Sequence, residues 1–137
     1  MDPTALQGDA ARIAFWINTY NERLRRSLAE RPRTGHLIRH RRLFRRESFD
    51  VGGLDYTLDV IEHGLLRRNA RPPYSPRRLL RPGDPRLEAA PSILDPRVHF
   101  ALNCGARSCP PIRTYSLARL DQELGAAARA YVAAESD

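Results

Sequence analysis

The stretch from Ala70 to Pro96 constrains the fold most, because seven of the chain's 11 prolines fall within it. Each proline fixes its φ angle and removes a backbone hydrogen-bond donor, so no long helix or strand can run through the stretch. A loop of this length is usually functional or mobile. Regular secondary structure is therefore expected on either side of a long surface excursion.

Apolar residues recur at helical spacing in the segments outside that stretch. Residues 10–28 carry them at i, i+3, i+4 and i+7, and residues 57–68 repeat the pattern with Leu58, Ile61 and Leu65. A short basic helix is expected over Gly35–Phe44. A last helix is expected after Ser116, which is a good N-cap residue. Its apolar stripe would be Leu117, Leu120, Leu124, Ala128 and Tyr131.

Two short segments are typical of β-strands. Phe49-Asp50-Val51 precedes a Gly52-Gly53 turn, and Arg97–Asn103 is an apolar run bounded by Asp95-Pro96 and Gly105. The 137 residues show no internal repeat or boundary and are the size of one domain, 1–137. We expect a fold of the α/β or α+β class, with three to four helices packed on a small β-sheet that contains the 97–103 strand.

The basic residues of the chain are unusual in kind. All 23 are arginine, and the formal net charge is +7. The lack of lysine is typical of the coding bias of a GC-rich genome, because selection for phosphate contacts would keep lysine as well. The densest run, residues 39–46, has no series of stacking aromatic residues. The pattern favours an anion-facing or solvated surface, with an acidic small molecule or peptide as the partner, over a nucleic-acid site.

No stretch approaches the ~20 apolar residues that cross a bilayer, so no membrane span is predicted. The start, Met1-Asp2-Pro3-Thr4, lacks the pattern of a signal peptide, which indicates a cytoplasmic location if that start is authentic. The two cysteines, Cys104 and Cys109, are too few for a disulfide framework and would be free thiols in a reducing compartment. The sequence predicts no oligomeric state.

Four segments, in this order, resemble the bacterial family called domain of unknown function 547. They are residues 15–21 (FWINTYN), residues 51–53 leading into residues 61–67 (IEHGLLR), residues 95–113, and the helix opening at Tyr115-Ser116. The resemblance implies a fold similar to papain-like and transglutaminase-like thiol enzymes in a rearranged chain order. Family members usually continue past the last helix with a Trp-Tyr pair and an Asp-Phe, which this chain lacks. Some plant relatives lack this cysteine pair.

The candidate chemistry is that of a cysteine nucleophile, which needs a base, a cation or a helix N-terminus beside its thiol. Cys104 ends the predicted strand and is the expected nucleophile, with Cys109 as a resolving or structural partner; the alternative is that Cys104 is a small buried hydrophobe. On a strand, His99 and Cys104 would lie roughly 16 Å apart on opposite faces. His63, on the 57–68 helix, is therefore the expected base.

Carboxylates near His63 would orient its imidazole, the third role in a catalytic triad. Asp59 lies one turn before His63, whereas Glu62 would act only through a neighbouring element. Gly64 would let another chain segment come close. The alternatives are that His63 is a histidine of helix packing and that His99 is a core histidine bonded to backbone.

The remaining candidates concern substrate binding. Backbone N–H groups around Gly105, or the Asn103 side chain, would stabilise an oxyanion. Asn18 and Asn21 share a helix face and would either bind backbone or hold an oxyanion. The full set of expected substrate-binding residues is Asn103, Gly105, Asn18, Asn21, Arg107, Arg113 and His99.

Arg107 and Arg113 would lower the pKa of the thiol and favour an acidic substrate. Zinc bound by the two cysteines with His63 and His99 is not expected, because the spacing between the cysteines departs from that of zinc fingers. No metal or cofactor is predicted. The sequence thus predicts a cysteine-dependent hydrolase or transferase acting on an amide or thioester. The alternative is a non-catalytic protein-interaction module with a basic surface.

Overall fold

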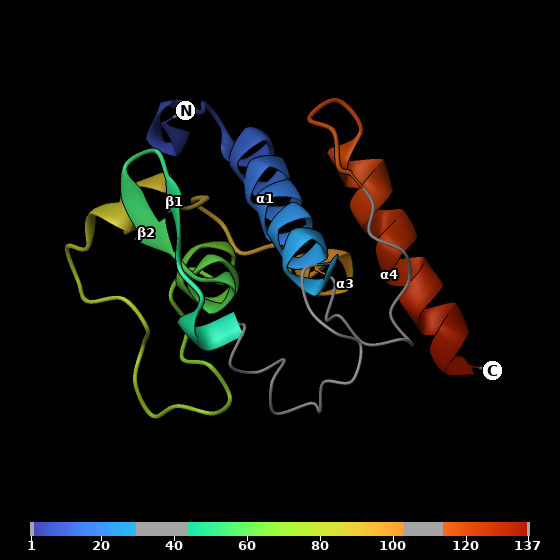
Figure 1. The fold of residues 1–137 in the computed structure, drawn as a ribbon. Coiled ribbons are helices and arrows are strands. Elements are labelled where there is room, and N and C mark those ends of the chain that lie inside the picture. Colours follow the sequence, from blue (N-terminus) through green and yellow to red (C-terminus); the bar gives the residue numbers. More distant parts are fainter. Residues whose placement is uncertain (1, 30–43, 103–113, 137) are drawn as a thin grey trace.

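Helix α1 (Asp9–Ala29) runs through the middle of the molecule, with a β-hairpin on one side and the C-terminal helix on the other (Figure 1). The computed structural model describes residues 2–29, 44–102 and 114–136. The apolar stripe of α1 lies in the core, where Trp16 and Ile17 are fully buried. The helix predicted over residues 10–28 is confirmed, and the burial of this stripe offsets the entropy lost when the segment is ordered.

The proline-rich stretch is tied back to α1 by two side chains. The Arg12 guanidinium donates hydrogen bonds to four backbone carbonyls, including that of Ala90 at 2.9 Å. Trp16 Nε1 donates to Ala89 O at 3.0 Å inside the core. As predicted, the stretch holds no long regular element, and its helical piece is the short 3-10 helix η3 (Pro85–Ala89). The stretch is thus held against α1 by side-chain hydrogen bonds.

The predicted strand and glycine turn form half of an antiparallel hairpin. Strand β1 (Phe49–Val51) pairs with β2 (Leu54–Tyr56), with Phe49 opposite Tyr56. Gly52 and Gly53 connect the strands with φ angles of 62° and 95°, the left-handed conformations that a two-residue hairpin turn requires. The sequence did not indicate β2. Among the described residues, the β-sheet consists of this two-stranded hairpin. A short 3-10 helix, η1 (Pro3–Ala5), precedes α1.

The second predicted helix is confirmed, with a change of geometry. Residues 58–59 are α-helical and lead into η2 (Val60–Leu66), a π-helix with a buried apolar face. Gly64 faces Leu80, and a Cβ on the glycine would lie 2.9 Å from Leu80 Cδ1. Asn69 and Leu80 exchange two hydrogen bonds of 2.9 and 3.1 Å. These contacts hold the proline-rich stretch against η2. Of the basic helix expected over Gly35–Phe44, residues 35–43 lie outside the described residues.

The strand predicted over Arg97–Asn103 is wrong, and so is the sheet built on it. Residues Val98–Ala101 form a short helix, α3. The Asp95 carboxylate accepts a hydrogen bond from the Arg97 N–H at 3.0 Å, and Pro96 has a fixed φ that is compatible with a helical turn, so residues 95–97 form the turn that leads into the helix. An apolar run this short has no periodicity that separates a strand from a buried helical segment.

The last helix begins later than predicted. Helix α4 (Leu120–Ser136) starts four residues after Ser116, whose N–H and hydroxyl both donate to the Glu123 carboxylate and do not cap the first turn. Leu120 and Leu124 of the predicted apolar stripe are buried and Ala128 is half-buried, whereas Leu117 and Tyr131 at its ends are exposed.

Figure 1 shows α3 between one end of α1 and α4, while η2 packs on the side of α1 that faces the hairpin. The described residues form a single small domain of mixed α and β structure, and the expected fold class is confirmed. Its core joins residues of α1, η2, the proline-rich stretch and α4. In the described ranges, we find no helix with the length and apolar character needed to span a membrane.

Candidate functional site

The η2 helix places a histidine and a carboxylate together. His63 is 8% exposed, and its Nε2 lies 3.9 Å from Glu62 Oε2. Glu62 was expected to need a neighbouring element to act on His63, but the two side chains approach each other directly. Adjacent residues of an α-helix do not face each other, whereas the wider turn of a π-helix reduces the angle between successive side chains. π-Helical turns are rare and occur frequently at functional sites.

Asp59, the other carboxylate predicted to orient His63, has a different partner. It accepts a hydrogen bond from the Tyr74 hydroxyl. The Tyr74 ring lies edge-on to the His63 ring, with 6.1 Å between centroids, and the Arg45 guanidinium carbon lies 4.0 Å from the Tyr74 centroid. Burial and the hydrogen bond to Asp59 raise the pKa of Tyr74, so its hydroxyl stays protonated at neutral pH.

Glu62 combines burial with cationic neighbours. Burial raises the pKa of its carboxyl, and the nearby His63 and Arg67 act in the opposite direction. Arg67 Nε lies 3.9 Å from Glu62 Oε2, and Arg67 Nη2 lies 3.4 Å from His99 Nδ1. A polar row of four residues, His63, Glu62, Arg67 and His99, therefore links η2 to α3.

His99 is not the core histidine that the sequence suggested. It lies on α3, is exposed, and has its ring edge-on to Phe100 and Tyr131 at centroid distances of 5.3 and 6.4 Å. Because residues 98–101 are helical, the strand-based separation of roughly 16 Å between His99 and Cys104 no longer applies.

Two asparagines of α1 hold the chain on both sides of residues 103–113. Asn21 Nδ2 donates to Ala101 O at 2.9 Å, before this segment. Asn18 exchanges two hydrogen bonds of 2.6 and 2.7 Å with the Tyr115 backbone, after it. Of the two roles considered for these amides, the structure shows backbone binding. The flanks of the cysteine-bearing segment are thus fixed to α1 about one turn apart.

The remaining predicted site residues lie outside the described part of the chain. They are Asn103, Cys104, Gly105, Arg107, Cys109 and Arg113. Of the predicted residues that are described, the structure brings Asp59, Glu62 and His63 together around η2. In the described ranges, no three His, Cys, Asp or Glu side chains gather as a metal site would require.

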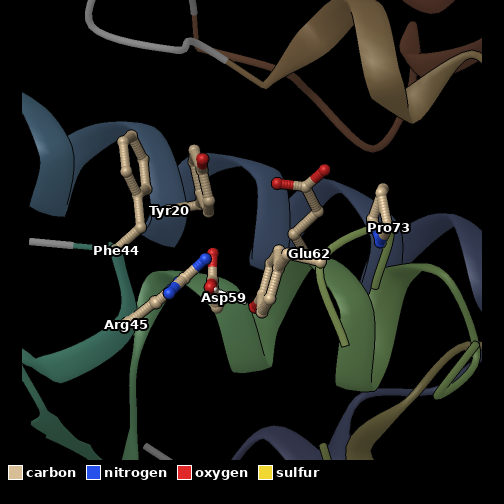
Figure 2. A pocket seen from close by; sticks show the side chains of 7 residues that line it. Tyr20, Phe44, Arg45, Asp59, Glu62 and Pro73 are labelled. Atoms are coloured by element: carbon tan, nitrogen blue, oxygen red, sulfur yellow. Dashed lines mark hydrogen bonds between the residues drawn. The ribbon is translucent and has the colours of Figure 1, made fainter. Parts of the chain in front are cut away.

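A cavity of about 410 Å³ opens beside the polar row. Figure 2 shows Tyr20 from α1 on the same opening as Asp59 and Glu62 from the η2 region. Its described lining residues are Tyr20, Phe44, Arg45, Asp59, Glu62, Pro73 and Tyr74.

The sequence did not single out Arg45, Arg67 or Tyr74 as site residues. One signal was present for Tyr74, which is the single aromatic residue between Ala70 and Pro96. Arg45 and Arg67 stand among 23 arginines, and no local pattern separates them from the others.

A family model described as "Protein of unknown function, DUF547" matches residues 3–132. The chain belongs to this family. No curated protein and no solved structure matches the chain. The DUF547 match confirms the resemblance carried by the four sequence segments, and it spans the polar row, both asparagines and the cavity. Because the DUF547 description assigns no function, the chemistry has to be argued from the site.

Proposed function

We propose that this DUF547 chain is a cysteine-dependent hydrolase or transferase acting on an amide or a thioester. His63 takes the proton of the Cys104 thiol, and the thiolate attacks the carbonyl carbon. The carbonyl oxygen becomes an oxyanion, which the Asn103 side chain or backbone N–H groups around Gly105 stabilise. His63 then protonates the leaving nitrogen or sulfur as the C–N or C–S bond breaks. Water or a second nucleophile attacks the acyl-enzyme thioester and releases the thiol.

The contact between Arg67 and His99 is the observation that carries this proposal. It joins the helix that bears His63 to α3, the helix that leads into the cysteine-bearing segment. Cys104 follows His99 by five residues, and five residues span at most about 18 Å. The chain can therefore reach from α3 to the neighbourhood of η2.

The hydrogen bonds of α1 support the same pairing. Asn18 and Asn21 fix both flanks of residues 103–113 to α1, and α1 packs against η2 and α3. The described residues on both sides of the cysteine-bearing segment are thus bonded to α1, which also packs against η2, the helix that bears the candidate base.

Between the two carboxylates predicted to orient His63, the contacts favour Glu62. Its Oε2 lies 3.9 Å from His63 Nε2, whereas Asp59 is engaged by the Tyr74 hydroxyl. Catalytic hydrogen bonds are often long before the substrate binds, so a distance of this size is compatible with an orienting role. In the proposed mechanism an ionised Glu62 stabilises the imidazolium that forms when His63 takes the proton.

Alkylation by iodoacetamide tests the proposal directly. Cys104 is expected to react about fivefold faster in the folded protein than in urea at mildly acidic pH, because an activated cysteine has more thiolate even after its lower nucleophilicity is counted. Peptide mapping assigns the rate to Cys104 or to Cys109, the proposed resolving or structural partner. Arg107 and Arg113 are expected to add to the activation by lowering the pKa of the thiol.

Paired histidine variants provide the control. His63→Gln is expected to reduce the folded rate to the level found in urea. His99→Gln, the same change on α3, keeps a side chain that can accept a hydrogen bond from Arg67, and it is expected to keep the folded rate above the rate in urea. Circular dichroism would verify that both variants fold. Equal folded and unfolded rates at both cysteines would refute the thiol mechanism.

A non-catalytic interaction module is the second candidate, and one observation favours it. A groove of about 570 Å³ between α1 and β1 is lined by Arg23, Arg26, Phe15 and Phe49, and also by the carboxylates of Glu22 and Asp50. The Arg23 guanidinium carbon lies 4.9 Å from the Phe49 ring centroid. Arginines beside aromatic rings are suited to an acidic peptide that carries apolar side chains, and binding of such a peptide by a chain with unreactive thiols would establish this function.

A further inference from the structure

The cavity beside η2 holds two carboxylates that are largely shielded from water. Asp59 is 9% exposed and the Glu62 side chain 20% exposed, and both line the cavity of about 410 Å³. Arg45 is the single cationic side chain among the described lining residues. Arg67 and His63 approach Glu62 but do not line the cavity. An excess of buried negative charge on the described part of the wall favours a positively charged occupant.

The Tyr20 hydroxyl is an independent sign that the cavity receives a polar group. Tyr20 is 3% exposed and lines the cavity from α1, as Figure 2 shows. Its hydroxyl has no hydrogen-bond partner among the residues that the structure describes, and it is not one of their fully buried polar atoms that lack a partner, so a ligand in the cavity can reach it. Burial raises the pKa of Tyr20, and the Glu62 and Asp59 carboxylates raise it further. A protonated hydroxyl with a free lone pair can accept a hydrogen bond from a bound cation.

The aromatic wall of the cavity already carries a cation from this chain. The Arg45 guanidinium lies over the face of the Tyr74 ring, at 4.0 Å from the centroid. Tyr20 and Phe44 stack nearby, with 6.1 Å between centroids. Aromatic faces beside carboxylates attract ammonium and guanidinium groups through the ring quadrupole.

We propose that this cavity is a binding site for the ammonium or guanidinium group of a basic side chain, with Glu62 as the counter-ion and the Tyr20 hydroxyl as an acceptor. The assignment of this group to a substrate rests on the proposed function, because Glu62 also lies beside the candidate base. Arg107 and Arg113 would still select an acidic group at another position of the same substrate. The ligand class is thus a peptide or amino-acid derivative with a lysine-like or arginine-like side chain.

Binding of small probes tests the site without relying on catalysis. The probes are Nα-acetyl-lysine methylamide and Nα-acetyl-arginine methylamide, with the norleucine and glutamate analogues as neutral and acidic controls. Amide chemical shifts of 15N-labelled full-length protein are followed during titration. We expect the two basic probes to bind and to shift the amides of Tyr20, Glu62 and Tyr74, while the neutral and acidic probes cause no shift there.

Three variants test which side chains of the cavity bind the cation. Glu62→Gln is expected to weaken binding of the lysine probe about tenfold to a hundredfold, because a charge-assisted hydrogen bond is lost. Tyr20→Phe, which keeps the ring in the core, is expected to weaken it about threefold to tenfold. Arg45→Met is expected to tighten it, because a charge of the same sign is removed. Glu88→Gln, the same charge change at an exposed position on η3, is expected to leave affinity unchanged.

Equal binding of the norleucine probe would overturn the proposal and leave an apolar cavity. Preference for the glutamate probe would overturn the proposal in favour of an anion site, and so would weaker binding of the glutamate probe in Arg45→Met. No shift with any probe would overturn it outright. Titration of a Cys104→Ser variant separates this site from the proposed function: unchanged binding of the basic probes combined with unreactive thiols would retain the site and remove the thiol mechanism.

Discussion

Replacement of Asn18 by alanine tests the link between α1 and the chain that follows the cysteine-bearing segment. The Asn18 amide both donates to and accepts from the Tyr115 backbone, at 2.6 and 2.7 Å. Each such bond contributes about 1 kcal/mol net, so Asn18→Ala should remove about 2 kcal/mol from the free energy of unfolding. For a domain of this length, that loss corresponds to a fall in Tm of about 7 °C.

Thr19→Ala is a matched control for this change. Asparagine and threonine have similar helix propensities, so alanine gains about the same helical stability at either position. Thr19 follows Asn18 on α1 and is also half-buried. The difference between the two variants in urea unfolding therefore isolates the two bonds to Tyr115.

The same pair of variants can be used in the labelling experiment. If Asn18 helps to fix the flank of residues 103–113, Asn18→Ala should lower the iodoacetamide rate of Cys104 in the folded protein, and Thr19→Ala should not. An Asn18→Ala protein as stable as Thr19→Ala would refute the reasoning, because the two short bonds would then contribute nothing to the folded state.

Three further predictions concern packing, titration and capping. Gly64→Ala should be less stable than Gly125→Ala by about 1–2 kcal/mol in urea unfolding, because its new Cβ meets the buried Leu80 at 2.9 Å while that of Gly125 meets only the ends of the Arg129 and Arg97 side chains; equal stability would contradict the close approach. Burial raises the pKa of Glu62, so the folded state holds a proton that the unfolded chain has lost, and stability falls as pH rises from about 4.3 through the raised value. Glu62→Gln should thus match the parent protein at about pH 4 and exceed it at about pH 8 in urea unfolding, and a loss at the higher pH would contradict this. Asp95→Ala should lose about 1 kcal/mol at neutral pH, because the Asp95 carboxylate accepts hydrogen bonds from the Arg97 guanidinium and the Arg97 N–H just before α3, and less at pH values below its lowered pKa; a loss independent of pH would exclude a role for the charged carboxylate.

Elements with a strong local code could be predicted from the sequence. The α1 stripe repeats over five turns, so its helical period is unambiguous, and its largest residue, Trp16, is fully buried. The Gly52-Gly53 pair marks a hairpin turn for a physical reason, since both positions require positive φ. The prolines after Ala70 excluded a long element there, and none formed.

The error at α3 has a local cause. Val98–Ala101 are apolar throughout, so neither a period of two nor one of 3.6 can be read from them. Asp95-Pro96 was interpreted as a boundary before a strand, although aspartate followed by proline is also the signature of a helix start. That second interpretation would have placed His99 on a helix, where its ring lies near Arg67.

The cavity could not be predicted from the sequence, because its walls come from separate parts of the chain. Tyr20 lies on α1, Arg45 before the hairpin, and Tyr74 in the proline-rich stretch. The local spacing of Asp59, Glu62 and His63 did indicate that they would gather around one helix. It could not show that Tyr74 would engage Asp59, or that a π-helical turn would bring Glu62 beside His63.

Glu62 connects the two proposals, because its carboxylate lies 3.9 Å from the His63 imidazole and also lines the cavity. A cation bound in the cavity would favour the ionised form of Glu62 and so lower the pKa that burial raises. The ionised form is the one that can stabilise an imidazolium on His63. In the proposed mechanism a basic substrate group would therefore do more than position the scissile bond: it would set the charge of the residue that supports the base.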